Sequence, residues 1–244
     1  MAERAFVKSI LKQETPTPLA VSISEPPATS RVPRVRLLAQ TLLGLGAYIA
    51  FALPYLRKTS GMDRLRPQER YLFVANHVSL LDTILLGALC WRSRCYPILV
   101  LGDKGVWRTS WLKRALSGPI GFLLERGKLN LKRIEELQTF GRAIGHSNLV
   151  VYPEGTRGDG ISVGACQPGV YFIAQEARAS IVPIFIRNMQ LVSTKGGRFH
   201  PVAGLRKIEV HFGEAIAPAA YLSLTRDEFT QFIRQKIAQA GGPA

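Results

Sequence analysis

A histidine followed by an aspartate is the first pair in this chain that could do chemistry. His77 and Asp82 come directly after the apolar run of residues 71–75. If a helix begins just after Ser79, with Ser79 as its N-cap, the carboxylate and the imidazole meet at the start of that helix. A carboxylate bonded to one ring nitrogen leaves the other nitrogen free to accept a proton. The pair predicts a general base for a hydroxyl nucleophile, with no covalent enzyme intermediate.

A purely structural role is the alternative for this pair. Ser-x-x-Asp is a good helix start by itself, and a histidine at a strand end is often only a hydrogen-bonded loop residue. The rest of the chain decides between the two readings.

A second polar cluster, Glu154-Gly155-Thr156-Arg157, follows the apolar run of residues 149–152. Arg157 offers a planar bidentate donor, Thr156 a hydroxyl and Gly155 unobstructed backbone, and these groups suit a phosphate. Glu154 could hold Arg157 by ion pairing or shape the floor of the site. The alternative is a solvated turn with a surface salt bridge of little energetic value.

A third apolar run, residues 122–124, leads to Arg126. Two arginines at separate strand ends could converge on one phosphate, so we predict Arg126 and the loop of residues 154–157 as the substrate-binding groups. A strand followed by a charged turn is the alternative for Arg126 alone.

The elements that must position these residues alternate between strands and helices. Continuous apolar runs indicate strands covered on both faces. The pattern predicts an α/β protein, with a single domain in which helices flank a central, mostly buried β-sheet. In such sheets ligands bind at the carboxyl ends of the strands, where the polar clusters lie. The expected strands are 71–75, 96–101, 122–124, 149–152, 181–186 and 208–212, and the expected helices are 80–90, 131–144, 169–177 and one that starts at Thr225 with a Thr225/Glu228 capping box and ends before Gly241.

Charge points to an anionic partner. The chain of 244 residues carries 32 Lys and Arg against 17 Asp and Glu, a net charge of +15. This surface should attract anionic polymers or lipid headgroups. The apolar segment described next favours an anionic membrane surface, and we expect no nucleic acid. The three cysteines have no metal-ligand spacing, so we predict no metal site and reduced thiols in a cytoplasmic environment.

The N-terminal part divides into a tail and an apolar segment. Residues 1–36 are rich in Pro, Ser, Thr and Arg, which predicts a disordered basic tail. Residues 37–56 carry no formal charge and are flanked by basic residues. We predict a membrane-associated helix over residues 37–57, at the cytoplasmic face, and a catalytic domain over 58–244. The length allows the helix either to span a bilayer or to lie in one leaflet, and a cleaved signal peptide is not expected.

Taken together and in order, these motifs resemble the glycerolipid (lysophospholipid) acyltransferase family, of the 1-acylglycerol-3-phosphate acyltransferase-like type. The resemblance covers roughly residues 58 to 215. The matching blocks are Asn76-His77-Val78-Ser79-Leu80-Leu81-Asp82 for the NHxxxxD motif, Phe122 to Arg126 for the second block, Pro153-Glu154-Gly155-Thr156-Arg157 for the EGTR block, and Ile181-Val182-Pro183-Ile184 for the fourth, with Gly61 to Leu65 as the lead-in.

The resemblance implies a membrane enzyme of phospholipid biosynthesis. It would move a fatty acyl group from an acyl-CoA or acyl carrier protein thioester to the hydroxyl of a lysophospholipid, with 1-acyl-sn-glycerol 3-phosphate as the expected acceptor and no further cofactor. His77 would deprotonate the hydroxyl, Asp82 would orient His77, and Arg126 with the 154–157 loop would bind the acceptor phosphate.

Two departures from the family pattern leave the acceptor open. The family often carries a Phe-Lys pair before the Pro-Gly that follows the third block, but here the stretch is Ala165-Cys166-Gln167-Pro168-Gly169 and has no Lys. Gly121 also lies one residue closer to Arg126 than usual. Glycerol 3-phosphate or a lyso-aminolipid is therefore an alternative acceptor. A non-enzymatic, basic membrane-binding protein is the alternative of another class. A serine esterase is disfavoured, because residues 145–149 lack the second glycine of a Gly-x-Ser-x-Gly elbow.

Overall fold

The computed structural model of the protein describes residues 32–125, 127–194 and 198–242. Within them a seven-stranded sheet has the order β1-β7-β6-β2-β5-β3-β4. Neighbouring strands are parallel except β6 and β7, which run antiparallel. The strands are β1 Leu56–Ser60, β2 Tyr71–Ala75, β3 Ile98–Asp103, β4 Gly121–Leu124, β5 Asn148–Val151, β6 Ser180–Arg187 and β7 Ile208–Phe212.

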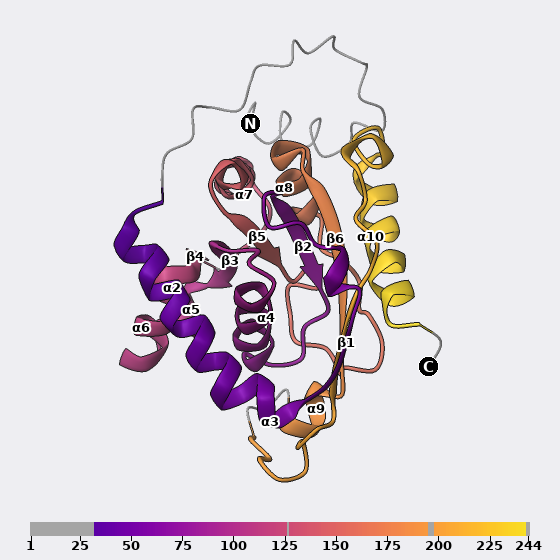
Figure 1. The fold of residues 1–244 in the computed structure, drawn as a ribbon. Coiled ribbons are helices and arrows are strands. Elements are labelled where there is room, and N and C mark those ends of the chain that lie inside the picture. The colour runs from indigo at the N-terminus through magenta and orange to yellow at the C-terminus, as the bar shows by residue number, and fades with distance from the viewer. Residues whose placement is uncertain (1–31, 126, 195–197, 243–244) are drawn as a thin grey trace.

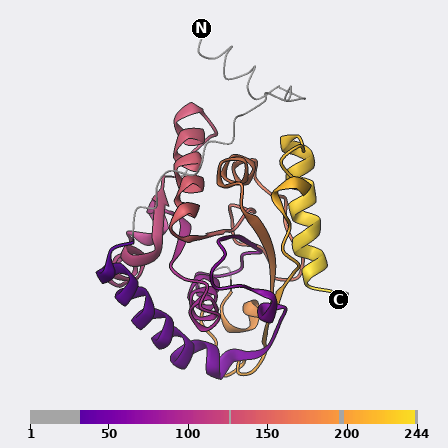
Figure 2. The same ribbon diagram turned by 45° about the horizontal axis from the view of Figure 1, so that its top comes forward.

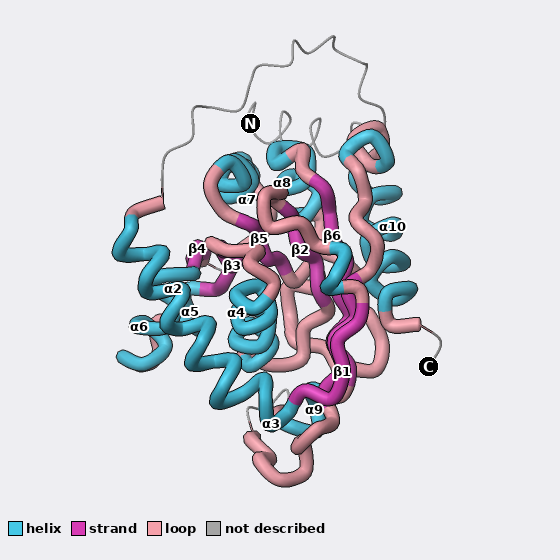
Figure 3. The backbone as a smooth tube through the Cα atoms, in the orientation of Figure 1, coloured by secondary structure: helices cyan, strands magenta, loops and turns pink. Residues whose placement is uncertain are grey.

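Helices cover both faces of this sheet (Figures 1 and 3). The helices are α2 Arg34–Ala47, α3 Leu53–Tyr55, α4 Leu81–Arg92, α5 Lys104–Trp107, α6 Trp111–Ile120, α7 Leu131–Arg142, α8 Gly169–Ala177, α9 Met189–Val192 and α10 Arg226–Ala240, with a π-helical turn at Tyr48–Ala52 and short 3-10 turns at Met62–Arg64, Ala143–Gly145 and Pro218–Ala220.

Two apolar cores lie on the two faces of the sheet. One joins α4 and the α2–α3 segment to alternate residues of β2, such as Phe73, and the other joins α7, α8 and α10 to the intervening residues, such as Leu72. The side chains of Phe73 and Leu72 are both fully buried. Figure 2 shows α2 and α10 on opposite sides of the sheet. The predicted α/β domain with a sheet covered on both faces is confirmed.

Most predicted elements lie where the sequence placed them, to within two residues at the strand ends. The Thr225/Glu228 capping box at the start of α10 is formed. α4 starts one residue later than expected, with Leu80 rather than Ser79 at the N-cap position. The Ser79 hydroxyl still accepts a bond from the Leu81 N–H at 3.3 Å. β1, α5, α6 and α9 were not predicted.

The apolar N-terminal segment forms one continuous helical stretch, Arg34–Tyr55, which by length and composition could cross a membrane. One side of it is attached to the domain. The buried Gln40 side chain exchanges hydrogen bonds with Ile98 N and O at the start of β3, and also donates to Pro119 O. Gly44 lies against Trp91 of α4, so closely that an added Cβ would lie 2.5 Å from Trp91 Cβ.

The other side of α2 is apolar and exposed. Leu38 and Leu42 are 60% and 61% exposed, and Val35 and Leu45 are also exposed. Ile49 in the π-helical turn and Leu53 at the start of α3 are exposed as well. The helix therefore has one face fixed to protein and one free apolar face, as in a helix that lies along an interface.

The sheet order brings the polar clusters together. β2, β5, β3 and β4 are consecutive, mutually parallel neighbours. Their carboxyl ends therefore share one edge, and His77, Glu154, Asp103 and Glu125 follow at or near these ends. This carboxyl edge is where an open α/β sheet binds its ligand.

Candidate active site

A cavity of about 540 Å³ opens at the carboxyl edge. Its walls come from all four strand ends and from α4, α5, α7 and α8. Polar and apolar groups are mixed, which suits an amphiphilic substrate. The lining includes His77, Thr83, Asp103, Val106, Trp107, Glu125, Gly127, Arg133, Leu137, Tyr152, Glu154, Gly155, Thr156, Arg157 and Gln167.

His77 and Asp82 meet as the sequence predicted. His77 Nδ1 lies 2.8 Å from Asp82 Oδ2. The same oxygen accepts the Val78 and Ser79 N–H groups at 2.7 and 2.8 Å. Asp82 is fully buried, whereas the His77 side chain is 18% exposed toward the cavity. Since an ionised carboxylate only accepts hydrogen bonds, Nδ1 carries the proton and Nε2 is left as the acceptor.

The ring of His77 is held on its face by Tyr152. The two rings stack with centroids 4.1 Å apart and planes 21° apart. The Tyr152 hydroxyl lies 3.1 Å from Thr83 Oγ1 on α4, one residue beyond Asp82. Burial raises the pKa of Tyr152 well above its ordinary value, with the Asp82 charge adding to the effect, so this hydroxyl stays protonated. α4 thus fixes the imidazole at its edge and, through Tyr152, at its face.

Glu154 connects the two loops of the site. Oε1 accepts the His77 backbone N–H at 3.0 Å, and Oε2 accepts the Gly164 N–H at 3.1 Å. A Cβ at Gly164 would lie 2.7 Å from Oε2, so only glycine allows this approach. Burial raises the pKa of Glu154, while the backbone donors at His77 and Gly164 partly offset that rise. In return, the Gly158 N–H donates to the His77 carbonyl at 2.6 Å.

The three residues after Glu154 turn along the cavity wall. Gly155 has φ +66°, a left-handed conformation that strains other residues, and its N–H donates to the Tyr152 carbonyl at 3.0 Å. Gly155 and Thr156 are exposed and Arg157 is half-buried. Among the described residues, no carboxylate forms a salt bridge with Arg157. Glu154, whose oxygens bind backbone, is thus not its ion-pair partner.

The predicted site residues lie together, except for one that the structure does not describe. His77, Glu154, Gly155, Thr156 and Arg157 line the cavity, and Asp82 lies directly behind His77. Arg126 lies outside the described residues, although its neighbours Glu125 and Gly127 both line the cavity. Of the residues described, no three His, Cys, Asp or Glu side chains gather as metal ligands would.

Sequence reasoning missed several cavity residues. Arg133, in the first turn of α7, is 14% exposed and pairs with Glu136 at 3.1 Å, so in the sequence it looks like an ordinary i,i+3 surface pair. Tyr152 and Thr83 are separated by 69 residues, and nothing local signals their contact. Gln167 gave one signal, because it lies in the stretch that departs from the family pattern.

This fold and site define a class: α/β proteins in which a histidine–aspartate pair and a Glu-Gly-Thr-Arg loop meet at the carboxyl edge of the sheet. The chain belongs to the Acyltransferase family, whose match covers residues 57–187.

Similar proteins include 1-acyl-sn-glycerol-3-phosphate acyltransferase of Saccharomyces cerevisiae (strain ATCC 204508 / S288c), 29% identical over 72% of this chain and 55% of that protein. Lyso-ornithine lipid O-acyltransferase of Pseudomonas aeruginosa PAO1 is 33% identical over 57% of this chain and 50% of that protein. The chain thus spans about half the length of these curated relatives. The crystal structure of the 1-acyl-sn-glycerophosphate (LPA) acyltransferase PlsC from Thermotoga maritima aligns with a TM-score of 0.63 at 17% identity, over 85% of this chain and 80% of that one, which shows a shared fold.

Proposed function

We propose that this protein is an O-acyltransferase that moves a fatty acyl group from an acyl-CoA or acyl carrier protein thioester to the hydroxyl of a lysophospholipid, with 1-acyl-sn-glycerol 3-phosphate as the first candidate acceptor. One observation carries the proposal. The oriented His77–Asp82 pair lies in the same cavity as Arg157, an arginine without a salt bridge to any described carboxylate. A base and an anion-binding group side by side suit a hydroxyl acceptor that bears a phosphate.

In the proposed reaction His77 Nε2 takes the proton of the acceptor hydroxyl while the hydroxyl oxygen attacks the thioester carbonyl. The tetrahedral intermediate collapses, the C–S bond breaks, and the leaving thiolate takes the proton from the imidazolium. Asp82 stabilises the transient positive charge on His77 through the 2.8 Å bond. Atoms and charge balance without any covalent acyl-enzyme.

The anionic part of the acceptor would bind the opposite wall. Arg157 supplies a bidentate donor and Thr156 a hydroxyl, next to the left-handed turn at Gly155. Arg133 lies in the same cavity and can share the charge. We include Arg126 in this group on the sequence pattern alone. Glu154 contributes indirectly, because its two oxygens connect the loop of His77 to the loop that ends at Gly164.

We place the enzyme on the cytoplasmic face of a membrane, with α2 lying along the surface. A spanning helix would need lipid around most of its circumference, yet α2 contacts α4 and α6 and buries Gln40 against β3. Its exposed leucines would enter the headgroup boundary. All three cysteines are free thiols, as expected in a reducing compartment.

A lyso-aminolipid is the second candidate acceptor. The relative from P. aeruginosa, named as a lyso-ornithine lipid O-acyltransferase, is 33% identical over its matched region. In this chain Gln167 lies against Gly155, since a Cβ added to Gly155 would lie 3.0 Å from Gln167 Cγ. Gln167 belongs to the stretch in which the family often carries a Lys. A neutral amide in place of that positive charge would bind a phosphate less strongly, so an acceptor without a phosphate would be disfavoured less.

Thiol release by the purified protein in detergent tests the acceptor. Palmitoyl-CoA would be offered with glycerol 3-phosphate, lysophosphatidic acid, a neutral lysophospholipid or a lyso-aminolipid, and acyl carrier protein donors would follow. Release that depends on lysophosphatidic acid supports the first proposal, and release only with the lyso-aminolipid supports the second. A folded protein that releases no thiol with any pair supports the non-enzymatic membrane-binding alternative.

A further inference from the structure

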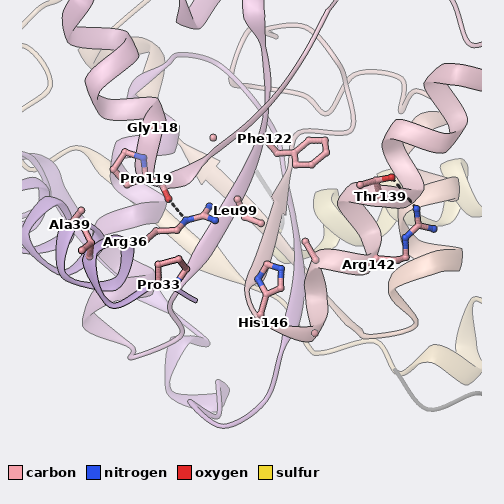
Figure 4. Close-up of a pocket in the computed structure, with 14 residues that line it drawn as sticks. Pro33, Arg36, Ala39, Leu99, Gly118, Pro119, Phe122, Thr139, Arg142 and His146 are labelled. Carbon is pink, nitrogen blue, oxygen red and sulfur yellow. Dashed lines mark hydrogen bonds between the residues drawn. The ribbon is translucent and has the colours of Figure 1, made fainter. Parts of the chain in front are cut away.

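A second cavity lies at the opposite end of the same strands. It measures about 920 Å³ and is formed where α2, α6 and the end of α7 approach the amino ends of β3 to β5 (Figure 4). It shares none of its lining residues with the catalytic cavity. We call it the amino-edge cavity. Leu99, near the start of β3, lines it, whereas Val100 to Asp103, toward the carboxyl end of β3, line the catalytic cavity. The two cavities thus lie at opposite ends of β3.

The walls of the amino-edge cavity are mainly apolar. Pro33, Val35 and Ala39 come from the start of α2, Pro119 from α6 and Phe122 from β4. Val35 is 80% exposed, so the cavity opens directly onto the free apolar face of α2. A lipid chain that lies along α2 would therefore reach the cavity without crossing a polar surface.

Positive charge faces this apolar wall. In Figure 4 the side chains of Arg36 and His146 point toward the middle of the cavity, and Arg142 lies on the far wall. Arg142 is balanced by Glu176 at 3.1 Å. Arg36 is not: its Nε donates to the Pro119 carbonyl at 2.7 Å, and none of the described carboxylates pairs with it.

The field around His146 is positive as well. Burial lowers the pKa of His146, and the charges of Arg36 and Arg70 lower it further. A half-buried guanidinium that no described carboxylate neutralises can pair with an anion. The terminal nitrogens of Arg36 have the geometry for a phosphate, and His146 can add a hydrogen bond.

We propose that the amino-edge cavity binds an amphiphile with an anionic phosphate head, the head on Arg36 and His146 and the acyl chain along Val35 and the exposed face of α2. The occupant is a membrane phospholipid rather than a soluble phosphate, because the apolar wall is continuous with the face of α2 that we assign to the bilayer. This site binds lipid without performing transfer. It would fix the orientation of the domain on an anionic membrane.

Calorimetric titration of the full chain in detergent tests the site. The probe is dihexanoyl phosphatidylglycerol, an anionic phospholipid that is neither the acceptor nor the product of acyl transfer to 1-acyl-sn-glycerol 3-phosphate. Dihexanoyl phosphatidylcholine has a net neutral head, and inorganic phosphate has a head without a chain. The variant Arg36→Gln is compared with Arg34→Gln, which removes the same charge from an exposed position of α2 that does not line the cavity.

We expect Arg36→Gln to weaken binding of phosphatidylglycerol about tenfold or more, the effect of losing charge-assisted bonds to phosphate, while Arg34→Gln and the catalytic-cavity variant Arg157→Gln bind as the unmodified protein does. Gly145→Leu should also weaken binding, because Gly145 lines the cavity and an added Cβ there meets open space. This second variant retains Arg36, so it guards against a folding defect in the first.

Three results would overturn the proposal. Arg36→Gln could bind like Arg34→Gln, phosphatidylcholine could bind as tightly as phosphatidylglycerol, or inorganic phosphate alone could bind as tightly with the same dependence on Arg36. Dependence on Arg157 in place of Arg36 would assign the lipid to the catalytic cavity. The titration measures no acyl transfer, so its outcome is independent of the proposed activity.

Discussion

At the residue scale, the position of His77 depends on partners that lie far from it in the sequence. Asp82 fixes the edge of the ring, and Tyr152 covers its face. The Tyr152 hydroxyl in turn is held by Thr83, so a single turn of α4 controls both contacts. Tyr152 does not exchange protons with the substrate in this account. It is a positioning residue for the base.

Replacing Tyr152 separates the stacking contact from the hydroxyl. We expect Tyr152→Leu to lower kcat roughly three- to tenfold, the worth of a ring–ring contact, with little change in KM for the thioester. Tyr152→Phe should retain most activity but lose about 1 kcal/mol of unfolding free energy with the hydrogen bond to Thr83. The double variant Tyr152→Phe/Thr83→Val should lose little more unfolding free energy than Tyr152→Phe alone, because the first change already removes the hydrogen bond. If the losses of the two single variants simply add in the double variant, the contact between Tyr152 and Thr83 is contradicted.

The buried carboxylate of Glu154 predicts a pH dependence of stability. Its pKa is raised in the folded protein, so the folded state binds the proton more tightly than the unfolded chain does. The stabilising contribution is complete below the ordinary carboxyl pKa and is lost as the pH rises through the raised value. The unfolding free energy of the wild type, minus that of Glu154→Gln, should therefore fall as the pH rises above about 4, the ordinary carboxyl pKa. Denaturant melts at several pH values measure it, and a difference that rises with pH would contradict the sign.

Sequence reasoning could reach part of this site for a physical reason. His77, Asp82 and the 154–157 loop follow apolar strands, and the ends of parallel strands share one edge of the sheet, so their convergence could be predicted. The contacts of Tyr152 and Arg133 could not. They depend on where side chains point from helices that pack against the sheet from other parts of the chain. The local spacing of residues does not predict those directions.

At the element scale, the strands with continuous apolar runs were found because burial on both faces leaves a clear pattern. β1, Leu56–Ser60, has no such pattern: it reads Leu-Arg-Lys-Thr-Ser, and within the described part of the chain it is an edge strand paired with β7 alone. α5 and α6 were missed because Pro119 lies inside α6 and the pair is short. For residues 37–56 the sequence left open whether the helix spans a bilayer or lies along its surface. The contacts that favour the surface position, Gln40 with Ile98 and Gly44 with Trp91, join residues far apart in the chain and could not be predicted.

The two glycines of α2 provide a matched test of that packing. Gly44→Ala should destabilise the protein by about 1–3 kcal/mol, because its Cβ would lie 2.5 Å from Trp91 Cβ. Gly46→Ala meets nothing within 4 Å and should be neutral or stabilise by up to about 1 kcal/mol through helix propensity. Thermal or denaturant unfolding compares the two. Equal shifts in both variants would mean that α2 is not docked on α4.

At the scale of the whole molecule, a net charge of +15 and the exposed face of α2 should act together on an anionic bilayer. In the proposed arrangement, charge would bring the protein to the surface and the leucines of α2 would retain it there. The catalytic domain would then meet the membrane lipids that we propose as acceptors.

Co-sedimentation with anionic vesicles tests this arrangement. The double variant Leu38→Asp/Leu42→Asp should bind at least about tenfold more weakly, since each buried leucine contributes over 1 kcal/mol of apolar transfer, while thermal stability stays unchanged. Val202→Asp is the control, because Val202 is 79% exposed but lies outside α2. Equal vesicle binding by all three proteins would exclude α2 as the membrane contact.

The most direct test of the whole account is the rate of acceptor-dependent thiol release by His77→Ala, measured with the acceptor that the wild type uses best. His200→Ala is the matched control, because His200 is exposed and outside both cavities. We expect His77→Ala to lose at least about a hundredfold in rate, the usual contribution of a general base, with an unchanged thermal melt, while His200→Ala keeps full activity. A folded His77→Ala variant that still transfers acyl groups at the wild-type rate would contradict it.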